Sequence, residues 1–143
     1  MNIKNLNQAF VQIAEKKNEL FQYAKSDQHS QDLKNELREL EQEFQYEFGS
    51  YIEEALFNVH DEFCPDNEVL KPIAYFAGRY VVSDRGENEF DVDQNEGIAV
   101  EADDFPGINA RLVLVPGPTR LVLQGVKESF KEIVWVARQP LEA

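Results

Sequence analysis

The sequence has a single cysteine, Cys64, among its 143 residues, so no disulfide can form within the chain. That usage is typical of proteins kept in a reducing cytosol, and we expect a cytoplasmic protein. No apolar run approaches the roughly 20 residues that a membrane-spanning helix needs. No apolar stretch follows Lys4 as it would in a secretory signal. The sequence therefore predicts a soluble protein with no membrane association.

Glycine-rich loops that bind phosphate are also missing, as is the glycine-flanked turn that presents a catalytic serine. Only two histidines, His29 and His60, are present to act as general bases. No pattern combines reactive residues at the spacing that one reaction requires. We therefore expect neither catalysis nor a cofactor.

Basic residues are scarce: 14 Lys and Arg face 27 Asp and Glu, which gives a formal net charge of -13. Such a chain repels nucleic-acid backbones and anionic membranes, because both attract Lys and Arg. The same charge attracts basic surfaces. The partner predicted from composition is thus a protein with a basic surface, and not a nucleic acid.

The acidic residues concentrate in two stretches, 41–62 and 84–104. Each stretch is explained either as a solvated surface that favours solubility or as a contact surface for a basic partner. Under the second interpretation the predicted contacts lie mainly in the later stretch. They are Asp84, Glu87, Glu89, Asp91, Asp93 and Glu96, together with Glu41, Glu43 and Glu47 of the earlier stretch.

Apolar residues recur every three or four positions from residue 3 to 24 and again from 33 to 63, which predicts two helices. Turn and capping residues at 26–30 separate them, and Pro65 ends the second. The first helix is rich in lysine and the second in acid, so an antiparallel hairpin is electrostatically favourable. The same apolar stripe would alternatively pair two subunits as a homodimer. Gly49 predicts a bend or a close helix crossing.

After Pro72 the composition changes to residues that favour strands. The predicted strands cover 73–82, 89–92, 98–102, 111–115, 119–123 and 132–138, with an acidic edge hairpin over 84–104 and a tight hairpin at Pro116-Gly117-Pro118. The fold class predicted is α+β in one domain, 1–143, with a helical hairpin (1–64) packed on a mainly antiparallel sheet (72–139) of five or six strands. Several strands are apolar on both faces. We expect the helices on one face and a partner, a second subunit or a ligand cavity on the other.

Two segments carry residues that bind metals in other proteins. His60 and Cys64 are four residues apart on one helical face, but a closed zinc site needs about four ligands, and a buried cysteine is often a small apolar residue. The segment from Asp91 to Ile98 resembles the start of a calcium loop, yet it has Glu96 where that loop needs glycine and Ala102 where it needs a carboxylate. An acidic turn is the simpler interpretation.

The function predicted is therefore a small acidic protein-binding module, such as an adaptor, a dedicated chaperone, or an inhibitor or immunity protein. The alternative is a small-ligand binder or enzyme with a cavity between helices and sheet. Such a cavity would be lined by Tyr75, Phe76, Tyr80 and Trp135. Aromatic residues of this kind are more often part of the core, and that is the favoured interpretation of these four.

Overall fold

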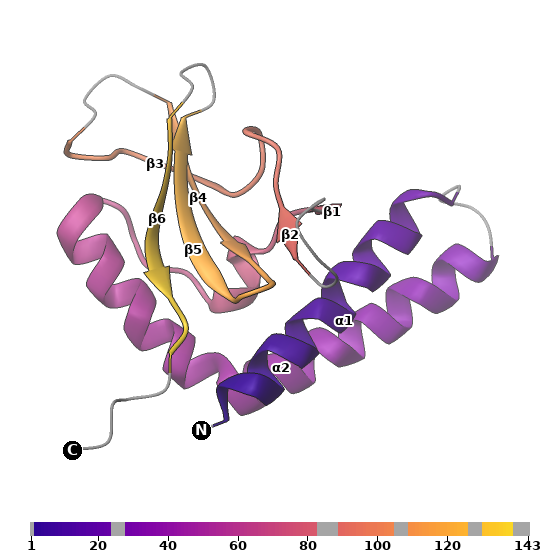
Figure 1. Ribbon diagram of the computed structural model, residues 1–143. Helices are drawn as coiled ribbons and strands as arrows, with labels where there is room; N and C mark the ends of the chain where they lie inside the picture. Colours follow the sequence, from indigo (N-terminus) through magenta and orange to yellow (C-terminus); the bar gives the residue numbers. More distant parts are fainter. Residues whose placement is uncertain (1, 24–27, 83–88, 105–108, 126–129, 139–143) are drawn as a thin grey trace.

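The computed structural model describes residues 2–23, 28–82, 89–104, 109–125 and 130–138. Its helices are α1 (Ile3–Phe21), α2 (Gln28–Phe63) and a 3-10 turn, η1 (Pro72–Tyr75). The strands are β1 (Val81–Val82), β2 (Phe90–Asp91), β3 (Ile98–Val100), β4 (Ala110–Val115), β5 (Arg120–Gly125) and β6 (Lys131–Val136). The predicted α+β class is confirmed, with a helical hairpin preceding antiparallel strands (Figure 1). None of the described helices combines the length and apolar character needed to cross a membrane.

The helical hairpin follows from local signals in the sequence. Asn2 caps α1, because its Oδ1 accepts a hydrogen bond from the backbone N–H of Asn5 at 3.1 Å. The predicted charge complementarity is confirmed in two ion pairs, Lys16 with Glu36 at 2.5 Å and Lys17 with Glu41 at 3.6 Å. Pairs at the surface each contribute at most about 1 kcal/mol. These ion pairs therefore favour the antiparallel pairing. Most of the stability of the hairpin comes from its buried apolar residues, which on α1 are Leu6, Phe10, Ile13 and Ala14.

The longer helix, α2, bends midway and packs against different partners on either side of the bend (Figure 1). Gly49 is buried near the middle of its 36 residues. A Cβ atom at Gly49 would lie 2.3 Å from Nε2 of Gln45, so the glycine leaves room for the Gln45 side chain. The earlier part of α2 contacts α1, whereas Tyr51 in the later part contacts Trp135 of β6 with ring centroids 5.7 Å apart.

An aromatic cluster joins the helices to the segment that follows η1. The Phe10 ring of α1 lies 5.6 Å from Phe44 of α2 and 4.9 Å from Phe76, and Tyr80 packs edge-on at 5.8 Å. Aromatic pairs in such geometries contribute about 0.5–1.5 kcal/mol each beyond the burial of their area. This cluster fixes the hairpin against the remainder of the chain.

The larger sheet has the order β3-β4-β5-β6 and is antiparallel throughout. The predicted tight hairpin is confirmed, since β4 pairs with β5 in the register Leu112 to Leu123 and Leu114 to Leu121. Gly117 in the turn has a φ of 73°, a conformation that glycine adopts without steric cost.

The predicted strand over 73–82 is wrong. Pro72 begins the 3-10 turn η1, and only Val81 and Val82 pair as a strand. The Tyr80 hydroxyl provides the physical reason. The Tyr80 hydroxyl accepts a hydrogen bond from the backbone N–H of Ala77 at 2.9 Å and donates one to the carbonyl of Leu114 at 2.9 Å. This side chain therefore satisfies backbone groups that a strand ladder would otherwise pair.

The predicted acidic edge hairpin over 84–104 is also wrong. Phe90 in β2 pairs with Val82 in β1, whereas Ile98 in β3 pairs with Leu112 in β4. The two acidic strands thus belong to different sheets. Residues 83–88 of the predicted hairpin lie outside the described residues.

Candidate functional site

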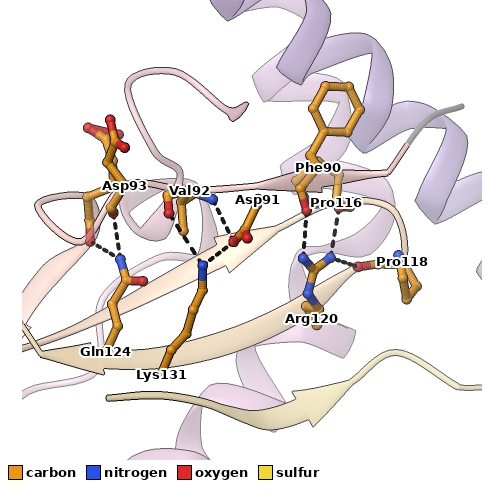
Figure 2. Close-up of polar contacts among 10 residues, drawn as sticks. Phe90, Asp91, Val92, Asp93, Pro116, Pro118, Arg120, Gln124 and Lys131 are labelled. Carbon is orange, nitrogen blue, oxygen red and sulfur yellow. Dashed lines mark hydrogen bonds and ion pairs between the residues drawn. The ribbon is translucent and has the colours of Figure 1, made fainter. Parts of the chain in front are cut away.

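The acidic segment from Phe90 to Gly97 lies across one face of the larger sheet. Figure 2 shows Arg120, Gln124 and Lys131 reaching from β5 and β6 toward this segment. The Arg120 guanidinium donates to the carbonyl of Phe90 at 2.6 Å. The Gln124 amide donates to the carbonyls of Asp93 at 2.8 Å and Glu96 at 3.3 Å.

This arrangement corrects the expectation that the second sheet face meets a partner, a second subunit or a ligand cavity. Val113 and Val122 are on the same face as Gln124, and both are buried. Gly97 lies against β4 so closely that a Cβ atom there would be 2.8 Å from Cβ of Val113. The chain therefore covers this face with its own segment. Ile133 of β6 is the one large apolar side chain of the described larger sheet that stays strongly exposed, at 58%.

The carboxylates of this segment are held by internal contacts as well. Asp91 forms an ion pair with Lys131, and its Oδ1 accepts a hydrogen bond from the Val92 N–H at 2.8 Å. Burial alone would raise the pKa of Asp91, but the bonds from Lys131 and Val92 and the nearby positive charges outweigh it. The pKa of Asp91 therefore lies below its ordinary value.

Asp93 and Glu96 also bind groups of the chain itself. Asp93 pairs with Arg79 at 3.3 Å, and Glu96 accepts a hydrogen bond from the Gly78 N–H at 2.5 Å. Both carboxylates tie the acidic segment to the stretch between η1 and β1. Because internal groups already bind them, Asp91, Asp93 and Glu96 contribute to the fold before they contribute to any partner.

The other predicted contact residues have different surroundings. Glu41 pairs with Lys17 of α1, and Glu89 is half-buried beside a surface groove. Glu43 and Glu47 are exposed, and no ion pair holds either of them in the described part of the chain. Asp84 and Glu87 lie outside the described residues. Of the seven predicted residues that the structure describes, Glu41, Asp91, Asp93 and Glu96 are held by contacts within the chain, whereas Glu43 and Glu47 are not.

The solvent side of α2 presents a feature that the sequence interpretation missed. Tyr46 is 92% exposed and Phe57 is 55% exposed, and their separation of 11 residues is close to three full helical turns. That spacing places two residues on one side of a straight helix, and here both rings are on the solvent side of α2, one before the bend and one after it. Exposed carboxylates flank both rings. We call this surface the α2 outer face, formed by Glu43, Tyr46, Glu47, Glu54 and Phe57.

His60 takes part in a hydrogen-bonded network at the end of α2. Nδ1 lies 3.0 Å from the Asn67 carbonyl, which can only accept, so Nδ1 carries a proton and donates it. In the neutral ring, Nε2 then accepts the hydroxyl proton of Tyr75 at 2.8 Å, while that hydroxyl accepts the Leu70 N–H at 3.1 Å. Both ring nitrogens of His60 are thus occupied in fixing the 64–75 segment to α2.

Cys64 is fully buried at the end of the same helix. Burial, together with the negative charge of Asp103, raises the pKa of its thiol to about 11. A thiol of this kind stays protonated at neutral pH and is a poor nucleophile or metal ligand. Within the described residues, no group of three or more His, Cys, Asp or Glu side chains could hold a metal ion.

Three of the four aromatic residues proposed to line a ligand cavity are core residues. Tyr75, Phe76 and Tyr80 are buried in the main apolar cluster. Trp135 is half-buried and packs against Tyr51. Burial raises the pKa values of Tyr75 and Tyr80, as expected for hydroxyls enclosed in the core.

A groove of about 1150 Å³ is instead found between α1 and the turn that joins β4 to β5. One wall consists of residues from the first three turns of α1. The rest of the described lining consists of Glu89, Gly117, Pro118 and Arg138. The sequence showed the α1 side chains, but the other residues of the lining lie about 80 or more positions away along the chain.

No protein family, curated protein or solved structure matches this chain. Its function is therefore argued from the two surfaces that the structure presents, the α2 outer face and the groove beside α1.

Proposed function

We propose that this chain is a small protein-binding module of the adaptor, dedicated-chaperone or inhibitor type, and that it recognises a basic surface on its partner. The α2 outer face carries the proposal. Tyr46 and Phe57 are exposed on the solvent side of one helix, among carboxylates that form no ion pair with any described residue. An apolar contact surrounded by negative charge is the arrangement that such a partner requires.

The aromatic rings would supply most of the binding free energy. An aromatic side chain buries about 150–250 Å², at roughly 25 cal/mol per Å² of apolar surface. Burying Tyr46 alone would contribute about 4 kcal/mol before the entropic cost of association is subtracted. Tyrosine is also frequent among the residues that dominate protein interfaces.

The carboxylates would supply selectivity and speed of association. Glu43, Glu47 and Glu54 are exposed, so water and salt screen them, and each adds little to the affinity. Their combined field attracts basic partners over longer distances and repels acidic ones. Because Cys64 is the only cysteine, we place this interaction in a reducing cytosol.

A photo-crosslinking experiment tests the proposal. Benzoylphenylalanine is placed at position 46 in one variant and, as a control, at position 82, where Val82 is equally part of an exposed surface but belongs to β1. In lysate of the native source, we expect position 46 to crosslink a basic protein. The product should disappear at about 1 M salt, where the Debye length is near 3 Å. Equal products from both positions would contradict the proposal, and a crosslink to a second copy of the chain would replace it with self-association.

Once the partner is purified, matched variants measure how much the two aromatic rings contribute to its binding. Tyr46→Ser combined with Phe57→Ser should weaken binding at least a hundredfold, because both anchoring rings are lost. Val82→Ser should leave binding unchanged. A partner that binds the double variant as tightly as the native chain would exclude the α2 outer face.

A further inference from the structure

The groove beside α1 has the dimensions of a short peptide. Two rows of α1 side chains, each with a spacing of four residues, form its wall: Ile3, Asn7 and Val11 in one row, and Lys4, Gln8 and Gln12 in the other. From Ile3 to Gln12 the helix rises about 14 Å, at 1.5 Å per residue. That length matches about four residues of an extended peptide. The volume of about 1150 Å³ exceeds the range of roughly 300–1000 Å³ that is usual for small-molecule pockets.

Hydrogen bonds between distant parts of the chain hold the groove open. The Thr119 N–H donates to Oδ1 of Asn7 at 3.1 Å, which fixes the β4–β5 turn against α1. At the other side, the Arg138 N–H donates to the Tyr51 hydroxyl at 3.2 Å, and that hydroxyl donates to the Arg138 carbonyl at 3.1 Å. A ligand therefore meets walls that are already positioned, which lowers the entropic cost of binding.

The charge of the groove is opposite to that of the whole chain. Lys4 and Arg138 are exposed in it, and neither forms an ion pair with any described residue. Among the lining residues that the structure describes, Glu89 is the one carboxylate. In a chain with 27 acidic and 14 basic residues, two cations beside one carboxylate form a local site for negative charge.

The neutral polar side chains match a peptide backbone. The Gln8 and Gln12 amides each offer a donor and an acceptor, and neither forms a side-chain hydrogen bond with the described residues. Ile3, Val11 and Pro118 give apolar contact area between them. Amides that can pair with backbone N–H and C=O groups, beside apolar surface and cations, are the components of a peptide site.

From these observations we propose that the groove binds an extended acidic peptide segment of another protein. The carboxylates of the peptide pair with Lys4 and Arg138, and its backbone pairs with the Gln8 and Gln12 amides. This site is separate from the α2 outer face and does not depend on the function proposed for that face.

The test uses a defined probe, the acetylated peptide Leu-Glu-Leu-Glu with a free carboxyl end, followed by NMR on the full chain labelled with ¹⁵N. We expect the side-chain amide signals of Gln8 and Gln12 and the backbone signal of Gly117 to shift. The peptide Leu-Lys-Leu-Lys should shift none of them. The proposal is overturned if the acidic peptide leaves these signals unchanged or if the basic peptide shifts them equally. Glutarate, a free dicarboxylate, would overturn the peptide assignment if it bound as tightly as the acidic peptide.

Charge reversal gives a second readout that loss of structure could not mimic. Lys4→Glu combined with Arg138→Glu should weaken binding of the acidic peptide at least tenfold and create binding of the basic peptide. A control with the same change in net charge, Arg38→Glu combined with Lys71→Glu, alters exposed residues outside the groove and should leave both affinities unchanged. Equal effects of the two pairs would mean that net charge, and not the groove, selects the peptide.

Discussion

Carboxylates from the two acidic stretches of this chain differ in how far the chain itself binds them. Asp91, Asp93 and Glu96 bind internal groups and hold a covering segment on the sheet. Glu43 and Glu47 on α2 are exposed without an internal ion pair among the described residues. The density of acid along the sequence is similar in the two stretches, so charge density alone does not locate a binding surface. What distinguishes a structural carboxylate from one that is free to contact a partner is whether groups of the chain itself bind it.

The largest expected effect on stability comes from disrupting the close contact between β4 and Gly97, at the end of the acidic segment that covers the sheet. Gly97 has a φ of 105°, and a Cβ atom there would lie 2.6 Å from the backbone oxygen of Leu112. We expect Gly97→Ala to lower the free energy of unfolding by about 3 kcal/mol, through backbone strain and steric overlap. Urea denaturation followed by circular dichroism measures this change.

Gly78→Ala is the matched control for that substitution. A Cβ atom at Gly78 would meet only Glu96 oxygens, at 3.6 Å and beyond, which is ordinary contact. Its free energy of unfolding should change by less than about 1 kcal/mol. Equal losses in the two glycine variants would show that the close approach to β4 is unimportant.

A smaller effect is expected in how the free energy of unfolding depends on pH, because Asp91 of the later acidic stretch is bound within the fold. The pKa of Asp91 is depressed in the folded chain, so the stability that it contributes is present above the unfolded pKa of about 3.8 and is lost as the pH falls through the folded value. Asp91→Asn should remove less than about 1 kcal/mol at pH 7, because the pair with Lys131 is partly exposed. The difference from the native chain should shrink as the pH falls below about 3.8 and vanish once the pH is below the folded pKa of Asp91. Unfolding curves recorded from pH 7 down through this range test the prediction, and a difference that persists at the acid end would contradict the assignment.

The smallest effect on stability is expected on α2. The triple substitution Glu43→Gln, Glu47→Gln and Glu54→Gln should change the free energy of unfolding by no more than about 0.5 kcal/mol, since these carboxylates bind no described residue. Association with a basic partner should become slower and less dependent on salt. Glu68→Gln with Glu101→Gln, on exposed residues outside α2, serves as the control in stopped-flow measurements. If the triple variant were strongly destabilised, these carboxylates would belong with Asp91 as structural groups.

Local patterns predicted the parts of the fold that local interactions determine. The helical hairpin follows from apolar periodicity and charge, and the β4–β5 hairpin follows from two apolar runs around Gly117. The strand predicted at 73–82 failed because Pro72 begins a 3-10 turn and the Tyr80 hydroxyl binds the backbone at Ala77, and apolar periodicity does not report such bonds.

The sequence of β5 contains one indication that the second face of the sheet is covered by another segment of the chain. Arg120 and Gln124 alternate with buried apolar residues on β5, so polar groups recur on one face of an otherwise apolar strand. Buried polar side chains need hydrogen-bond partners. Here Arg120 and Gln124 find them in the backbone carbonyls of the segment that lies across this face. The groove had no comparable signal, because its walls come together only when α1 meets a turn more than a hundred residues later.

The course of α2 makes the two halves of the molecule thermodynamically dependent on each other. One continuous helix packs on α1 before its bend and beside β6 after it, so neither half keeps its packing if this helix unravels. Its amide hydrogens should therefore exchange with solvent at rates close to those of complete unfolding. A ligand held on the solvent side of this helix would slow exchange in the sheet without touching it, since binding favours the folded ensemble as a whole.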